Sequence, residues 1–167
     1  YTYSARGDLV AVYDAAGGVT RYTYDGEGHT LQVVDPGGAV TTLTWGGYHK
    51  LCARRDGNGD EVRLAYDLEG ELLHVRNERG EEHRFTYDSA GRLVAETMFD
   101  GRVLTYKNDA LGRPIRVTDG LGRKTTLTYD LAGQLVGREL AGGSSESFEH
   151  DLLGRVVAAA GPVCEVR

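Results

Sequence analysis

Short apolar segments alternate along the whole chain with short segments rich in glycine and aspartate. The apolar segments are about six residues long and rich in β-branched and aromatic residues, as in Leu9–Tyr13 and Val19–Tyr24. Segments of this length and composition, bounded by turn residues, are typical of β-strands. No segment shows the 3.6-residue periodicity of a helix. The pattern predicts an all-β fold, an antiparallel array of β-hairpins with about sixteen strands.

The pattern repeats every 21 residues without insertion or deletion. An aromatic pair opens each unit, first as Tyr1 and Tyr3 and then as Tyr22 and Tyr24. The second position of the pair holds Tyr3, Tyr24, Trp45, Tyr66, Tyr87, Asn108, Tyr129 and His150. Such a fixed period indicates a repeat architecture. We interpret residues 1–167 as one array with units 1–21, 22–42, 43–63, 64–84, 85–105, 106–126, 127–147 and 148–167. Because residue 1 already lies inside a repeat, the chain is expected to be part of something longer.

Each unit contains two Asp-x-x-Gly turns. Aspartate at the first turn position can accept a hydrogen bond from the backbone two residues on, and glycine at the fourth position accepts a positive φ. The aspartates that carry this motif include Asp14, Asp25, Asp35, Asp67, Asp88, Asp109, Asp130 and Asp151. The glycines include Gly7, Gly17, Gly28, Gly38, Gly70, Gly91, Gly112, Gly133 and Gly154. Together with the aromatic positions, these residues form the predicted structural motif.

The odd repeat length constrains the strand pairing. Side chains alternate between the two faces of a strand, so an odd repeat would turn the aromatic pair to the opposite face in each successive unit. One bulged residue per unit would restore the face. We therefore predict one β-bulge per repeat. A wholly apolar column, which begins with Val10, Leu31 and Cys52, is expected to join the aromatic face. A sheet of this width is expected to curl into a strip or spiral.

Composition and charge narrow the function classes. The chain carries a net charge of -6 with no basic patch, which argues against a nucleic-acid partner. No apolar run reaches the length of a membrane span, and no signal peptide is present at residue 1. The two cysteines, Cys52 and Cys164, fall at different repeat positions and are interpreted as small hydrophobic residues rather than a disulfide.

The unit consensus Y-x-Y-D-x-x-G-R-L-x-x-V-x-D-x-x-G resembles the RHS or YD-repeat family over the entire chain. It is plainest in Phe85–Leu93 and in Leu127–Leu135. Repeat three, with Gly46 and His49, and repeat six, with Asn108, depart from it, so the consensus does not fix the local turn geometry there, although the array continues. The resemblance implies a β-sheet that spirals into a hollow shell. In bacterial Rhs effectors and Tc toxins such a shell encloses a toxic C-terminal domain, and in teneurins a similar shell serves adhesion.

Several residues that suggest chemistry are better explained by the repeat. The segment 35–39 superficially resembles the family's Asp-Pro processing motif but lies in phase with the other turns and lacks its leucine. Likewise, the oxygen-rich segment 56–61 lacks the full ligand pattern of a calcium loop. The histidines His29, His49, His74, His83 and His150 occupy five different repeat positions, so no metal site is predicted. We predict no catalytic, cofactor-binding or metal-binding residues, and no cofactor.

The favoured hypothesis is a non-enzymatic shell segment of a secreted or surface-delivered bacterial protein. Its expected partners are adjoining RHS repeats and a C-terminal toxin cargo absent from this chain, with self-association possible through the sheet edges. The alternative is an extracellular array whose aromatic rows bind glycans or proteins. An enzyme is the third hypothesis, without a recognisable site. The two hypotheses differ in where they place the tyrosines: packing inside the wall would favour the shell, whereas an open groove lined by them would favour glycan binding. The tyrosines concerned are Tyr3, Tyr24, Tyr66, Tyr87 and Tyr129.

Overall fold

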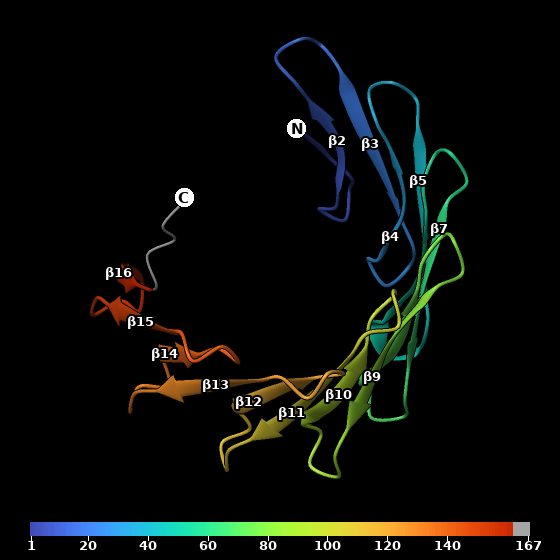
Figure 1. Cartoon of the computed structure of the whole chain (residues 1–167). Coiled ribbons are helices and arrows are strands. Elements are labelled where there is room, and N and C mark those ends of the chain that lie inside the picture. The colour runs from blue at the N-terminus through green and yellow to red at the C-terminus, as the bar shows by residue number, and fades with distance from the viewer. Residues whose placement is uncertain (162–167) are drawn as a thin grey trace, which may run out of the picture. The chain divides into compact units, whose positions relative to one another are not determined.

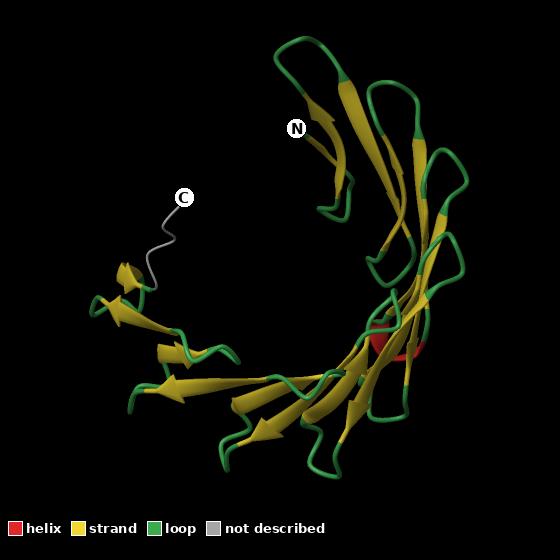
Figure 2. Ribbon diagram, viewed as in Figure 1, coloured by secondary structure: helices red, strands yellow, loops and turns green. Residues whose placement is uncertain are grey.

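The computed structural model describes residues 1–161, and the strands follow the predicted order. Both segments used above to predict strands, Leu9–Tyr13 and Val19–Tyr24, are strands with those bounds. The strands are β1 (Thr2–Tyr3), β2 (Leu9–Tyr13), β3 (Val19–Tyr24), β4 (Thr30–Val34), β5 (Val40–Trp45), β6 (Leu51–Arg55), β7 (Glu61–Tyr66), β8 (Leu72–Arg76), β9 (Glu82–Tyr87), β10 (Leu93–Thr97), β11 (Val103–Asn108), β12 (Pro114–Asp119), β13 (Lys124–Tyr129), β14 (Leu135–Glu139), β15 (Ser145–His150) and β16 (Val156–Ala160). Among the described residues the sole helical segment is a 3₁₀ turn, η1 (Gly47–His49), which Figure 2 shows in red.

The sixteen strands form one antiparallel sheet in sequence order, so the predicted meander is confirmed. Figure 1 shows the hairpins succeeding one another along the chain, each joined to the next by a short turn. The chain divides into two compact units, Tyr1–Arg84 and Phe85–Arg167. The division falls between the fourth and fifth sequence repeats.

The predicted bulge is present in every repeat whose pairing the structure describes. In the second repeat Thr23 pairs with Gln32 and Tyr24 pairs with Thr30, which leaves Leu31 as the extra residue. The same shift follows β1, β5, β7, β11, β13 and β15. The extra residues at these junctions are Val10, Leu31, Cys52, Leu73, Ile115, Val136 and Val157. They are members of the apolar column, so this column is explained by the bulge.

Apart from the turn between β5 and β6, the turns between strands repeat one geometry. The backbone amide of Asp88 donates to the Arg92 carbonyl at 2.9 Å, and the Gly91 amide donates back to the Asp88 carbonyl at 3.0 Å. Glycine follows in the left-handed region, as in Gly91 with φ 73°. This arrangement is a type I turn closed by a residue in the left-handed region, a common hairpin loop. The fourteen glycines of the two glycine columns all have positive φ.

The sheet is a single layer with little fully buried surface. Ala11, at 8% exposure, is the only apolar core residue among those described. Most strand side chains are half-buried, because neighbouring strands cover their flanks while no second layer covers their ends. Cross-strand pairs and hydrogen bonds must therefore hold the sheet together to an unusual extent.

Candidate functional site

In repeats two, three, four, six and seven, the side chain at the second aromatic position ties its repeat to the preceding one. The Tyr24 hydroxyl donates to the Leu9 carbonyl at 2.7 Å, and the Tyr66 hydroxyl donates to the Leu51 carbonyl at 3.1 Å. The Tyr129 hydroxyl does the same to Pro114 at 2.9 Å. Each acceptor is the residue just before the bulge of the preceding repeat. A bulge interrupts the ladder of backbone hydrogen bonds, and the side chain supplies a donor there.

A hydrogen-bond donor also stands at this position in repeats three and six, where tyrosine is replaced. In repeat three Trp45 donates through Nε1 to the Thr30 carbonyl at 2.8 Å. In repeat six Asn108 donates through Nδ2 to the Leu93 carbonyl at 2.9 Å. Its turn also keeps the usual form, because the Asp109 amide donates to Arg113 at 2.9 Å. The turn geometry that the sequence left open in repeat six is thus the usual one, and the Asn108 amide takes the place of the tyrosine hydroxyl as hydrogen-bond donor.

The turn aspartates act as acceptors for the backbone. Oδ1 of Asp109 accepts from the amides of Leu111 and Arg113, both at 2.9 Å, while Oδ2 accepts from Arg113 Nε at 2.8 Å. Asp14 and Asp25 make the same two backbone contacts. Asp35 and Asp67 accept from the residue four positions on, at 2.8 Å each. Asp130 does so from Gln134 at 2.8 Å. These contacts give the aspartates a local structural role.

An arginine directly after the turn glycine lowers the pKa of several turn aspartates. Hydrogen bonds from the Arg92 side chain lower the pKa of Asp88, and those from the Arg123 side chain lower the pKa of Asp119. For Asp151 the backbone amide of Arg155 is the largest cause of a lowered pKa, followed by its guanidinium. In the Asp-x-x-Gly-Arg turn, an ion pair between the aspartate and the arginine thus bridges the hairpin loop.

Stability is expected to fall at acid pH because of these turns. An aspartate whose pKa is lower in the folded state stabilises the fold at pH values above its unfolded-state pKa, which is near 3.8. This contribution is lost as the pH falls through the folded-state pKa. We expect Tm to vary little from about pH 7 to 5 and to decrease below about pH 4. Thermal denaturation followed by circular dichroism measures this. Replacing Arg92 and Arg123 with glutamine should flatten the decrease, and a main loss of stability near pH 6 would contradict the explanation.

The other chemical candidates of the sequence occupy ordinary positions. The segment 35–39 is a turn in which Gly38 has φ 86°. In segment 56–61, Asp56 Oδ1 accepts from the amides of Asn58 and Asp60 at 2.9 and 3.1 Å, so this oxygen is engaged within the turn. Cys52 is a half-buried free thiol, and Cys164 lies outside the described residues.

The turn of repeat three, whose geometry the sequence left open, differs from the others. Tyr48 and His49 both have φ 57°, and His49 stands in the column where the other repeats carry glycine. Residues other than glycine rarely adopt this conformation. Gly46 replaces the turn aspartate, and a Cβ at this position would lie 2.5 Å from the Cys52 Sγ atom. The local sequence therefore produces a distinct turn, which presents His49 at the edge of the sheet.

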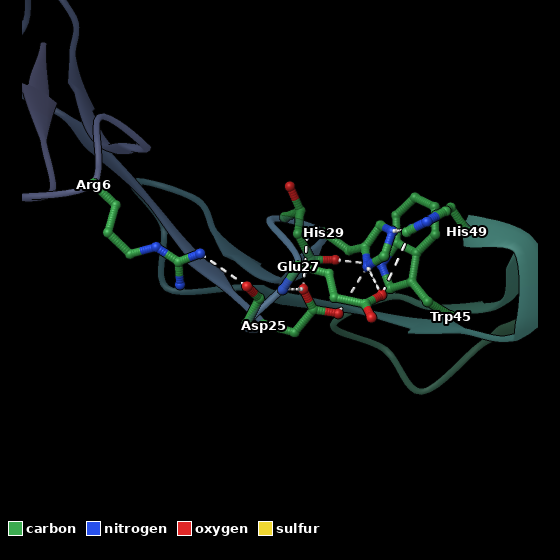
Figure 3. Close-up of polar contacts among 8 residues, drawn as sticks. Arg6, Asp25, Glu27, His29, Trp45 and His49 are labelled. Atoms are coloured by element: carbon green, nitrogen blue, oxygen red, sulfur yellow. Dashed lines mark hydrogen bonds and ion pairs between the residues drawn. The ribbon is translucent and has the colours of Figure 1, made fainter.

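His49 contacts His29, which lies in the corresponding turn of repeat two. His49 Nδ1 is 2.6 Å from His29 Nε2, and the His29 ring stacks on Trp45 at a centroid distance of 4.8 Å. His29 Nδ1 lies 2.8 Å from Asp25 Oδ2, and this contact lowers the pKa of the Asp25 carboxyl. Glu27 completes the group, with its Oε2 atom 3.6 Å from His49 Nδ1 (Figure 3). The ligand atoms of Glu27, His29 and His49 all lie within 4.8 Å of one another.

The sequence argument that the histidines do not converge is wrong for this pair. His29 and His49 occupy different repeat columns, but those columns are adjacent and the two repeats are consecutive. In a repeat array with 21-residue units, residues 20 positions apart on successive turns lie close together at one edge of the sheet. That spacing was the signal in the sequence that could have identified the cluster.

Comparison with known proteins relates the whole array to one family. The Teneurin YD-shell family model matches residues 1–130 and 50–159. No curated protein sequence matches the chain. Among the described residues, no helix is long and apolar enough to span a membrane.

Solved structures show the same fold. The crystal structure of TcdB2-TccC3-Cdc42 has a TM-score of 0.69 at 14% identity, over 99% of this chain and 11% of that one. TcdB2-TccC3-TEV gives 0.68 at 19% identity, over 92% of this chain and 9% of that one. The Tc holotoxin pore of Photorhabdus luminescens has a TM-score of 0.63 at 17% identity, and the match covers 87% of this chain and 9% of that one. The chain thus spans only about a tenth of the length of these proteins.

Proposed function

The chain belongs to the Teneurin YD-shell family, and we propose that it forms a segment of a shell wall that encloses a C-terminal toxin cargo. In this proposal residues 1–167 are one continuous array of eight repeats. The mechanism is steric, because the wall separates the cargo from its surroundings until delivery. Adjoining RHS repeats complete the wall, and the protein is secreted or delivered at the bacterial surface.

One observation carries the proposal: the array is a single-layer sheet whose repeats are tied to one another by side-chain-to-backbone hydrogen bonds. A sheet without a covering layer is suited to a wall, and within residues 1–161 neither face is covered by a helix or a second sheet. The bonds from Tyr24, Tyr66 and Tyr129 reach the preceding repeat, so they join unit to unit. The turn and aromatic residues therefore carry the mechanical role.

The same contacts support a non-enzymatic role and weaken the case for glycan binding. The tyrosines at the second aromatic position are half-buried, apart from the terminal Tyr3 at 60% exposure. Hydroxyls that already donate to the backbone cannot also donate to a sugar. A surface hollow of about 670 Å³ in the second unit is lined by residues such as Leu104, Val117 and Thr125, with no aromatic side chain. Stacking on a sugar requires such a side chain.

Protease protection of the cargo tests the proposal. The full-length protein that contains this array is compared with its C-terminal region expressed alone, each treated with the same protease. We expect the C-terminal region to persist in the full-length protein and to be degraded when alone. A variant with Tyr24, Tyr66 and Tyr129 all replaced by phenylalanine weakens the wall and should shorten the protection.

Equal degradation of the free and the linked C-terminal region would contradict enclosure. The glycan alternative is examined in parallel on a glycan array with the 167-residue chain. Tight binding that is abolished when Tyr24, Tyr66 and Tyr129 are replaced with leucine, which removes the rings, would favour the adhesion role and overturn the shell proposal.

A further inference from the structure

The cluster of Glu27, His29 and His49 goes beyond a structural wall, and we propose that it binds one Zn²⁺ ion between the turns of repeats two and three. Two imidazole nitrogens and a carboxylate oxygen are a ligand set that Zn²⁺ accepts, with a fourth position left for water. The three residues belong to consecutive turns at one edge of the sheet. A bound ion would therefore clip two neighbouring repeats together.

The three ligand atoms lie within 4.8 Å of one another, and side-chain movement would bring them to the spacing of a zinc site. Zinc bonds of about 2.0–2.1 Å in a tetrahedral site place neighbouring ligand atoms about 3.3 Å apart. His29 Nε2 and His49 Nδ1 are closer than this at 2.6 Å, while His49 Nδ1 and Glu27 Oε2 are slightly farther apart at 3.6 Å. Glu27 and His49 have side-chain exposures of 70% and 68%, so both can adjust.

His29 is the fixed member of the site. Its side chain is only 13% exposed and stacks on Trp45, whose own Nε1 donates to the Thr30 carbonyl. The contact with Asp25 at Nδ1 leaves Nε2 facing His49. A carboxylate on the far nitrogen of a metal-binding histidine orients the ring and raises its basicity as a ligand. Arg6, in the corresponding turn of repeat one, donates to the Gly26 carbonyl at 2.8 Å and helps to hold the turn that carries Glu27 and His29 (Figure 3).

The backbone conformation of His49 determines what its turn presents at the sheet edge. At φ 57° this residue takes the left-handed backbone that glycine supplies in the other repeats. Backbone strain of this kind clusters at ligand-binding positions, where the surrounding structure maintains it. The turn thus presents an imidazole where the repeat would otherwise place no side chain.

Calorimetric titration with ZnCl₂, after treatment with a chelator, tests the site. We expect one Zn²⁺ per chain and no comparable binding of Mg²⁺, which prefers oxygen ligands. The His49→Gly variant should keep the fold, because glycine suits this backbone, but bind at least about 10-fold more weakly. Asp25→Asn should weaken binding by about 10–100-fold, as expected for a residue that orients a ligand. Co²⁺ in place of Zn²⁺ should give the visible absorption of a tetrahedral complex.

Tyr48→Gly is the matched control. It removes the neighbouring strained residue, which is 78% exposed, and leaves all three ligands in place, so binding should be unchanged. The proposal is overturned if the unmodified chain binds no stoichiometric Zn²⁺, or if His49→Gly binds as tightly as the unmodified chain. An equal loss in Tyr48→Gly and His49→Gly would also overturn it, because binding would then depend on the shape of the turn and not on the imidazole. Circular dichroism of each variant confirms that it is folded.

Discussion

Replacing Tyr129 with phenylalanine is expected to lower the free energy of unfolding by about 1–2 kcal/mol. The substitution keeps the ring and removes only the hydroxyl that donates to the Pro114 carbonyl at 2.9 Å. This acceptor lies at a bulge, where the ladder offers no replacement donor. For a chain of this size the loss corresponds to a fall in Tm of roughly 2–8 °C. Thermal and urea denaturation measure it, and Tyr13→Phe, at an exposed tyrosine outside this column, should change stability by less than about 0.5 kcal/mol.

Substitutions at the same position in other repeats separate the donor from the ring. Asn108→Leu removes the amide that donates to Leu93 and should be destabilising to a similar degree, whereas Asn108→Tyr should be tolerated because tyrosine supplies a donor. His150 stands in this column with its Nδ1 atom enclosed and without a hydrogen-bond partner. His150→Tyr should therefore stabilise the protein by about 1 kcal/mol. Equal effects of leucine and tyrosine at residue 108 would refute the donor explanation.

Replacing Gly143 with alanine is the second substitution for which we expect a large effect, a loss of about 1–2 kcal/mol. Gly143 has φ 81°, and an added Cβ would meet no atom within 4 Å. The whole effect is therefore backbone strain and not a clash. Chemical denaturation of the purified variant measures this loss.

Gly142→Ala in the same turn is the control. This residue also has open space around its Cβ position, but it does not have a positive φ. Alanine there should be neutral or stabilising by up to about 1 kcal/mol, because it restricts the unfolded chain. If both substitutions had the same effect, the left-handed turn would not be the reason for glycine in this column.

The sequence by itself determined the strands, the turns and the existence of a bulge in each repeat. These features follow from local chemistry: Leu9–Tyr13 forms a strand through its β-branched and apolar residues, and a period of 21 forces a change of register once per unit. Repetition strengthened each inference, since every column offered up to eight examples of the same local preference.

Only the tertiary structure decided which contacts join one repeat to the next. The Tyr24 hydroxyl reaches a carbonyl 15 residues earlier, and the sequence alone indicates an aromatic column without its acceptor. Likewise, His29 and His49 meet because successive turns lie side by side at the sheet edge, which single columns do not reveal. The physical reason is common to both cases: local preference fixes the backbone of each hairpin, whereas contacts between hairpins depend on the register that stacks them.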